Sequence, residues 1–146
     1  MTVKLTERLG QAVAHNRDGL YNVVYLYGNE ESVTLLLDTV VVLTASAQPD
    51  KKVARIKANF LADEWYRDIL QGRRPAVPEC DVLILEGIHE VAGREVMEQL
   101  LYGVFDHFLE SHRRLIFTGN GPTSQIQSLA ERIRAQIDGG VALELE

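Results

Sequence analysis

Short apolar runs of strand length alternate with amphipathic segments of helical length along this chain of 146 residues. The plainest run is Asp81–Leu85, "DVLIL", in which no polar residue interrupts the apolar ones. A continuous apolar strand is typical of a sheet that is covered on both faces. Because consecutive parallel strands need a crossover connection, usually a helix, the alternation predicts a three-layer α/β domain built on a parallel sheet.

The expected elements follow one another without linkers, repeats or low-complexity tracts, so residues 1–146 are predicted to form a single domain. The segment Ser32–Ala47 is ambiguous, because its valines and threonines favour a strand while its length and its place after a turn favour a helix. We interpret it as a helix. The expected strands are Asn22–Tyr27, Val53–Lys57, Asp81–Leu85, Arg114–Thr118 and Val141–Leu145. The other expected helices are Leu5–His15, Ala62–Leu70, Arg94–Ser111 and Ile126–Ile137.

Composition excludes several classes of protein. A net charge of -6 argues against broad attraction to DNA or to an anionic membrane. The single cysteine, Cys80, cannot form an internal disulfide, and the apolar run Val33–Val42 is too short to span a bilayer. Since the N-terminus also has no signal-peptide pattern, we expect a cytoplasmic protein. The four histidines lack metal-ligand spacing, so neither a metal site nor a cofactor is predicted.

Ligands of open α/β sheets bind beyond the C-terminal ends of the strands. Three of these ends carry polar or glycine residues, namely Tyr27–Asn29, Glu86–Gly87 and Thr118–Asn120. The first lies in "VVYLYGNEESVT", a strand followed by a glycine-containing turn and an apolar segment. Nucleotide-binding proteins keep their phosphate loop at this position, between a strand and a helix.

Five segments, among them "DVLILEGIHEVAGRE" and "LIFTGNGP", together resemble the family of the bacterial replication initiator DnaA. "DVLILEGIHEVAGRE" is similar to the Walker B segment of that family, and "LIFTGNGP" to its sensor 1 strand and turn. The remaining three are similar to the approach to the phosphate loop, to the helix after the second strand and to the segment that carries the arginine finger. They are "AVAHNRDGLYNVVYLYG", "NFLADEW" and "SLAERIRAQIDGGVALEL".

The resemblance implies an AAA+ core of the P-loop NTPase class with about five strands. In that order the first strand, Asn22–Tyr27, is central and lies beside Leu115–Thr118. The likeness covers nearly the whole chain and ends with the α/β core. It includes neither the helical lid nor the helix-turn-helix DNA-binding domain of the family.

The chain departs from the family at its phosphate loop. A working loop reads G-x-x-x-x-G-K-[ST], with a lysine on the phosphates and a hydroxyl on Mg²⁺. Here the stretch keeps Gly28 and a candidate hydroxyl in Thr34, but it lacks the second glycine and the lysine. Glu30 and Glu31 lie where phosphate would come, and they suit the helix dipole themselves. We interpret the stretch as a degenerate phosphate loop.

The Walker B and arginine-finger positions also depart from the family pattern. Glu86 replaces the first acid of Walker B, and Gly87 replaces the second, which would polarise the attacking water. Asn120 could still serve as sensor 1. The position that best matches the arginine finger is Gln136, which is neutral. We therefore predict no catalytic residues, and only remnants of a nucleotide site at Gly28, Thr34, Glu86 and Asn120.

Simpler interpretations exist for most of these residues. Glu86 at a strand end is more often a hydrogen-bonded acid than a metal ligand, and Asn120 is an ordinary turn residue. Arg73–Arg74, Arg113–Arg114 and the pair Arg132/Arg134 are interpreted as solvated charges, with partner binding a minority alternative. Trp65, Phe105 and Phe108 are expected in the core.

Three functions from different classes remain open. The first is a nonhydrolysing DnaA-like adaptor or regulator that acts through protein–protein contacts in chromosomal replication initiation or its control. Its partner surface would include Ser128–Ile137 with Arg132 and Arg134 exposed, and its partner would be a replication protein of the AAA+ initiator class or a second copy. The second is an atypical ATP- or ADP-binding protein of the DnaA family. The third is a DNA-binding replication protein, against which the acidic charge stands.

Overall fold

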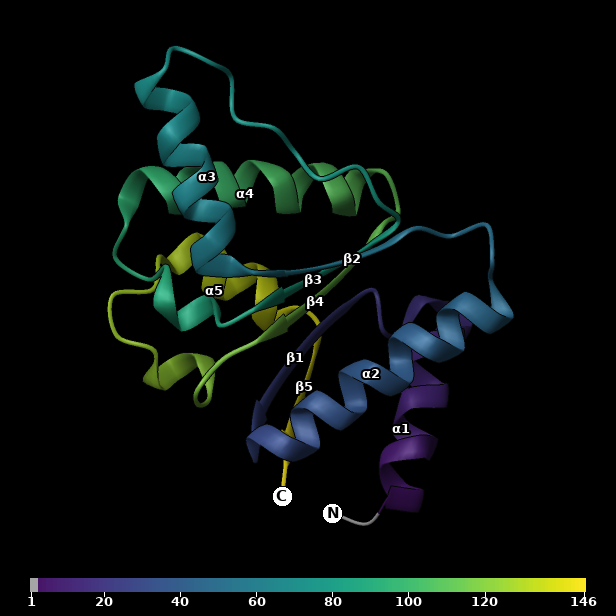
Figure 1. The fold of residues 1–146 in the computed structure, drawn as a ribbon. Helices are drawn as coiled ribbons and strands as arrows, with labels where there is room; N and C mark the ends of the chain where they lie inside the picture. The colour runs from purple at the N-terminus through teal and green to yellow at the C-terminus, as the bar shows by residue number, and fades with distance from the viewer. Residues whose placement is uncertain (1–2) are drawn as a thin grey trace.

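A five-stranded parallel sheet with strand order β2-β3-β4-β1-β5 forms the centre of the molecule (Figure 1). The computed structural model describes residues 3–146, apart from the side chains of residues 3–5 and 18. The strands are β1 (Val23–Gly28), β2 (Val53–Lys57), β3 (Val82–Glu86), β4 (Arg114–Thr118) and β5 (Val141–Leu145). Each prediction of a strand is confirmed to within about a residue at either end.

The prediction that the first strand lies inside the sheet beside Leu115–Thr118 is confirmed. β1 lies beside β4, with Val24 opposite Ile116 and Leu26 opposite Thr118. On its other side it pairs with β5, so it is an interior strand, but the middle position of the five belongs to β4. Both neighbours are parallel to it, as the predicted fold requires.

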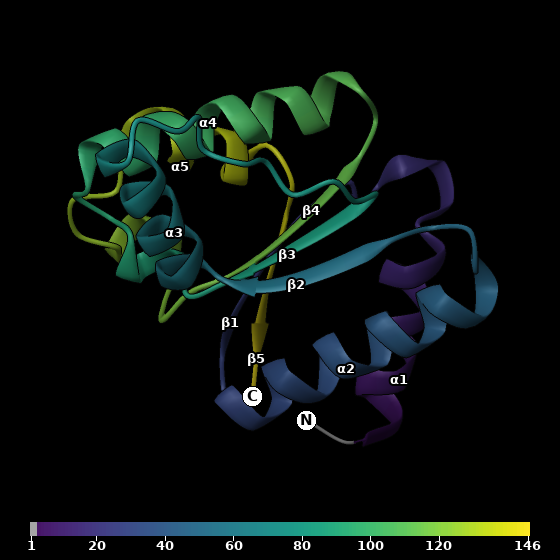
Figure 2. The same cartoon turned by 45° about the horizontal axis from the view of Figure 1, so that its top comes forward.

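Helices cover both faces of the sheet (Figure 2). Alternate residues of each strand point to opposite faces. Val24 and Leu26 therefore face α1 and α2, while Tyr25 faces the layer of α3, α4 and α5. The helices are α1 (Val3–His15), α2 (Glu30–Ala47), α3 (Ala58–Leu70), α4 (Glu95–Glu110) and α5 (Glu131–Asp138). Short 3-10 turns are η1 (Arg17–Gly19), η2 (Ile88–Glu90) and η3 (Thr123–Gln125).

The ambiguous segment is helical, as predicted, and begins two residues earlier than expected. The side chain of Asn29 accepts a hydrogen bond from the Ser32 amide at 3.0 Å and so caps α2. Leu36, Leu37 and Val40 form the buried face of the helix. Burial of that face against the sheet outweighs the weak helix propensity of the β-branched residues.

The helix predicted for Ile126–Ile137 is wrong at its start. Residues 126–130 are irregular, and α5 begins only at Glu131. Ile126 and Leu129 are buried as expected, but from a loop in which Ser128 has a φ of +63°. Their spacing imitates a helical stripe because the loop turns both side chains into the same core as Ile133.

Arg114 contradicts the interpretation of the Arg113–Arg114 pair as solvated charges. Its side chain is buried, and its guanidinium donates to the carbonyl oxygens of Val13 and Ala14 at the end of α1. Unpaired carbonyls at a helix C-terminus attract a cation. Burial lowers the pKa of Arg114 from its ordinary value. This arginine, the first residue of β4, therefore links that strand to the end of α1.

The predicted core residues Trp65, Phe105 and Phe108 are all buried, which confirms that interpretation. Trp65 also donates from Nε1 to the carbonyl oxygen of Ala76 at 2.8 Å. Among the helices of residues 3–146, none has the length and apolarity that a bilayer crossing would require.

Candidate functional site

The C-terminal edge of the sheet begins with an unusually short turn after β1. β1 ends at Gly28 and α2 begins at Glu30, so Asn29 alone connects them. The Asn29 amide donates to the Leu145 carbonyl of β5 at 2.8 Å, and the Val33 amide donates to the Asn29 carbonyl at 3.0 Å. A phosphate cradle needs several free amides on a wide loop. Here a single residue makes the turn, and its amide is used by the sheet.

Gly28 is required by the close approach of β5. Its φ is +112°, and a Cβ atom built on it would lie 2.1 Å from the Leu145 carbonyl oxygen. Only glycine fits such a position without displacing a neighbouring backbone. The Ser32 hydroxyl adds a further contact to this corner, donating to the backbone oxygen of Glu146 at 2.7 Å. The glycine that resembled a phosphate-loop residue thus has a structural role of its own.

Two carboxylates occupy the first turn of α2, as the sequence indicated. Glu30 and Glu31 are exposed there, next to the cap made by Asn29. The amides of Ser32 and Val33 both donate to Asn29, to its side chain and its carbonyl oxygen respectively. Thr34 lies in the second turn and lines a shallow hollow of about 440 Å³ with both glutamates. Any anion near this helix end would meet two negative charges.

Glu86 at the end of β3 is held by Arg55 of β2. Arg55 donates from Nε to Oε2 at 3.3 Å and from Nη2 to Oε1 at 3.2 Å, a bidentate pair. Its Nη1 also donates to Asp38 of α2 at 2.6 Å. Burial acts to lower the pKa of Arg55, but the hydrogen bonds to Glu86 and Asp38 outweigh it and raise that pKa. The Glu86 carboxylate is therefore already occupied by a fixed cation.

The ends of β3 and β4 are joined by a polar contact. The Gly87 amide donates to the Thr118 hydroxyl at 3.0 Å. Asn120 lies just beyond, exposed, in the turn after β4. Tyr25 holds that turn, because its hydroxyl donates to the Gly121 carbonyl at 2.5 Å. Burial raises the pKa of Tyr25 to about 12, so this donor stays protonated at neutral pH.

The predicted partner surface on α5 is only partly exposed. Arg132 is exposed, and its guanidinium lies 4.4 Å from the centroid of the Tyr102 ring of α4. Arg134 bonds instead to its own chain, to Glu131 at 3.2 Å and to the Ile126 carbonyl at 3.0 Å. Its side chain is 23% exposed. Of the two arginines, Arg132 is the one available to a partner.

Glu98 is a buried acid that the sequence did not single out. Its two carboxylate oxygens accept from the Gly93 amide at 3.0 Å and from the Ala130 amide at 2.7 Å. The first amide follows β3, and the second stands immediately before α5. An acid in the first turn of an amphipathic helix was the available signal, but the sequence does not show which amides donate to it. Glu98 fixes the position of α5 against α4.

The strand ends gather the predicted residues at one edge of the sheet. Gly28, Glu86 and Asn120 all lie at or just beyond the C-terminal ends of neighbouring parallel strands. Thr34 lies one turn into α2, further from that edge. Among residues 3–146, no group of three or more His, Cys, Asp or Glu side chains could hold a metal ion. The edge therefore combines one fixed ion-pair cluster with two exposed carboxylates.

A sequence profile of one protein family, the bacterial DnaA ATPase domain, matches residues 2–144. The chain belongs to this family. The predicted resemblance is thus confirmed over nearly the whole length. A relative within it is the chromosomal replication initiator protein DnaA of Psychromonas ingrahamii, 23% identical over 93% of this chain and 31% of its own length. The chain spans about three tenths of that relative.

Solved structures confirm the AAA+ fold of the DnaA ATPase family. Domain III of the replication initiation protein DnaA from Thermotoga maritima superposes with a TM-score of 0.85 at 17% identity, covering 98% of this chain and 62% of that one. The DnaC helicase loader superposes with a TM-score of 0.77 at 13% identity, covering 97% and 87%. The α/β, P-loop NTPase-like architecture predicted from the sequence is therefore present, here with a phosphate-loop position only one residue long.

Proposed function

We propose that this chain is a nonhydrolysing DnaA-type module that acts through protein–protein contacts in chromosomal replication initiation or its control. The observation that carries the proposal is the β1–α2 connection. One residue, Asn29, occupies the place of a phosphate loop, and its amide and side chain are both engaged within the fold. Glu30 and Glu31 then supply negative charge where a triphosphate would need positive charge.

The Walker B position supports the same proposal. The carboxylate of Glu86 is paired bidentately with Arg55, which opposes its use as a Mg²⁺ ligand. Gly87 supplies no side chain to polarise water, and its amide is bonded to Thr118. No lysine follows Gly28 in the turn, no second acid follows Glu86, and position 136 is a glutamine. We therefore expect the chain not to stabilise phosphoryl transfer.

The replication context comes from the relatives. The names of the similar proteins describe a replication initiator and a helicase loader. We infer that this module contacts a replication protein of the AAA+ initiator class, with a second copy of this chain as the other choice. Arg132 on α5 is the arginine best placed for that contact, because Arg134 is engaged by Glu131 and Ile126.

Calorimetric titration with ATP and with ADP, each with Mg²⁺, tests the nucleotide half of the proposal. We expect no binding heat at micromolar nucleotide and no phosphate release. A double variant, Glu30→Gln with Glu31→Gln, removes the repulsion without restoring the loop, and it is expected to remain without binding. A dissociation constant below about 10 μM, roughly -7 kcal/mol, for the parent chain would favour the atypical nucleotide-binding alternative instead.

Binding to full-length DnaA of the same cell tests the partner half. Arg132→Glu reverses the exposed charge on α5, while Arg8→Glu, an exposed arginine on α1 across the sheet, is the matched control. We expect Arg132→Glu to weaken binding at least tenfold and Arg8→Glu to leave it unchanged. Equal binding by both variants would mean that α5 is not the interface.

A further inference from the structure

α2 is apolar on three sides, and the third side is uncovered. One side packs on the sheet through Leu36, Leu37 and Val40. A second approaches α1 so closely that a Cβ on Gly10 would lie 2.4 Å from Thr39. The third carries Leu35, Val42 and Ala45, all exposed, with Val42 65% exposed. Exposed apolar residues that line one side of a helix are a candidate contact surface for a partner.

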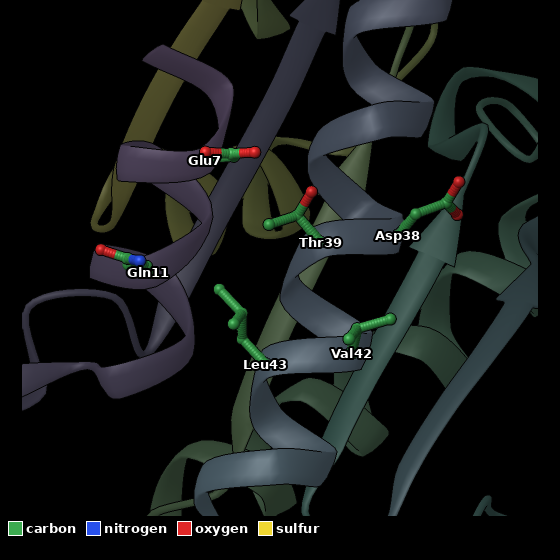
Figure 3. A pocket seen from close by; sticks show the side chains of 6 residues that line it. All are labelled: Glu7, Gln11, Asp38, Thr39, Val42 and Leu43. Carbon is green, nitrogen blue, oxygen red and sulfur yellow. The ribbon is translucent and has the colours of Figure 1, made fainter. Parts of the chain in front are cut away.

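Two hollows lie along this third side. The first, of about 340 Å³, lies between α1 and α2 and is lined by Glu7 and Gln11 of α1 and by Asp38, Thr39, Val42 and Leu43 of α2 (Figure 3). The second is the hollow of about 440 Å³ at the start of α2, which includes Leu35 and also reaches Asp38. Both hollows are lined by Asp38, and we refer to their combined lining on α2, from Glu30 to Val42, as the strip. At the rise of an α-helix this strip is about 18 Å long, roughly three turns of a docked helix.

The strip is bordered by negative charge. Glu7, Glu30, Glu31 and Asp38 all lie along it, and the sequence of α2 contains no lysine or arginine. Arg55 pairs with Asp38 from the strand side, and the Asp38 side chain nevertheless stays 57% exposed. On α1, Arg8 is exposed one residue from Glu7 but does not line the hollow. The surface therefore alternates carboxylates with apolar side chains along α2, because Glu31, Leu35, Asp38 and Val42 follow one another at helical spacing.

We propose that this strip docks an amphipathic helix of a protein partner, with apolar residues at helical spacing flanked by lysines and arginines. Such a helix would cover Leu35 and Val42 while its cations meet Glu7 and Glu31. A second copy would bring the same carboxylates against one another, and nucleic acid would be repelled. The strip lies on the opposite face of the sheet from α5, so this proposal stands apart from the proposed function.

A synthetic amphipathic helix of leucine and lysine, carrying a fluorophore, is the probe. Anisotropy measures its affinity, and amide chemical shifts of isotope-labelled protein locate it. We expect shifts confined to α1 and α2, and at least tenfold weaker binding of a scrambled peptide of the same composition. Val42→Arg should also weaken binding about tenfold, because it removes a valine's contact area and adds a like charge.

Val96→Arg is the matched control, since Val96 is 57% exposed on α4 across the sheet. It should bind the probe like the parent, and melting curves show that both variants are folded. If the scrambled peptide bound with equal affinity, the binding would depend only on the net charge of the peptide, and the proposal would be overturned. Unchanged binding by Val42→Arg would overturn it too. A parent dimer in sedimentation that Val42→Arg abolishes would assign the strip to self-association instead.

Discussion

The substitution Gly28→Ala distinguishes between two explanations of this glycine. Either the contact with β5 requires it, or it is a remnant of a nucleotide-binding site. The residue has a φ of +112°, which side chains rarely adopt, and the added Cβ would lie 2.1 Å from the Leu145 carbonyl oxygen and 2.9 Å from the Leu145 amide nitrogen. Both atoms belong to backbone, so no side-chain rotation relieves the overlap. β5 must move away from β1, or β1 must change its conformation.

The loss of stability expected for Gly28→Ala has two parts. A left-handed or otherwise strained backbone at a residue other than glycine costs about 1–3 kcal/mol. Forcing an extra methyl group into a packed site costs about a further 1–3 kcal/mol, here because Leu145 is buried and its carbonyl accepts from Asn29. We expect Gly28→Ala to lower the free energy of unfolding by about 4 kcal/mol.

Urea denaturation, followed by circular dichroism, measures the effect against two matched glycines. Gly72 has a φ of +72° and open space around it, so Gly72→Ala should cost only the backbone part, about 1 kcal/mol. Gly103 lies in the middle of α4 with nothing within 4 Å of an added Cβ. Gly103→Ala should therefore stabilise the protein by about 0.5–1 kcal/mol.

The order of the three variants decides the matter. If Gly28→Ala costs no more than Gly72→Ala, the contact with β5 does not constrain this position. The presence of glycine at position 28 would then need another explanation, and its interpretation as a remnant of a nucleotide site would be favoured. A loss near 4 kcal/mol with no change in nucleotide titration would place the residue in the framework of the sheet.

Three further outcomes follow from buried polar groups. Arg114→Ala should lower the free energy of unfolding by about 3 kcal/mol in urea titrations, because it leaves a cavity and unpaired carbonyls at the end of α1. For Tyr25, whose pKa rises from 10.0 to about 12 on folding, the unfolded chain ionises first. Stability should fall by up to about 3 kcal/mol between these two pH values, and the difference between parent and Tyr25→Phe across that range should isolate this loss. Glu98→Gln should expose the Ala130 amide to faster hydrogen exchange and cost about 2 kcal/mol, since an amide group replaces one of two acceptor oxygens.

β1, β3 and β4 could be predicted from the sequence because they are short, apolar and almost wholly buried. β3 and β4 have nearly continuous burial, which leaves no polar alternation to confuse the pattern. α4 could be predicted for the complementary reason, because its buried stripe includes Met97, Leu101, Val104 and Phe108 at helical spacing. The same rule failed at Ile126 and Leu129. Apolar spacing records which side chains are buried, and a loop can bury them at the same intervals as a helix.

The site was predictable as a location and much less as a set of contacts. Gly28, Glu86 and Asn120 reach one sheet edge because parallel strands must end on the same side. The partner of Glu86 is Arg55, thirty-one positions earlier, and only the pairing of β2 with β3 brings them together. The burial of Arg114 depends likewise on where α1 ends against the sheet. Single-sequence patterns carry local burial, whereas these ion pairs and caps depend on the register of distant strands.

The position of β1 has a consequence for how the chain reaches its native state. Both strands that pair with β1 lie in the last third of the sequence, with Val23 opposite Leu115 and Val24 opposite Val141. During synthesis, the first strand and the helices on either side of it therefore wait for most of the chain before any sheet partner emerges from the ribosome. Non-local pairing of this kind slows folding and leaves apolar surface exposed meanwhile. We expect a chain truncated before β4 to aggregate or be degraded, and a chaperone to be needed for longer here than for a domain whose strands pair in sequence order.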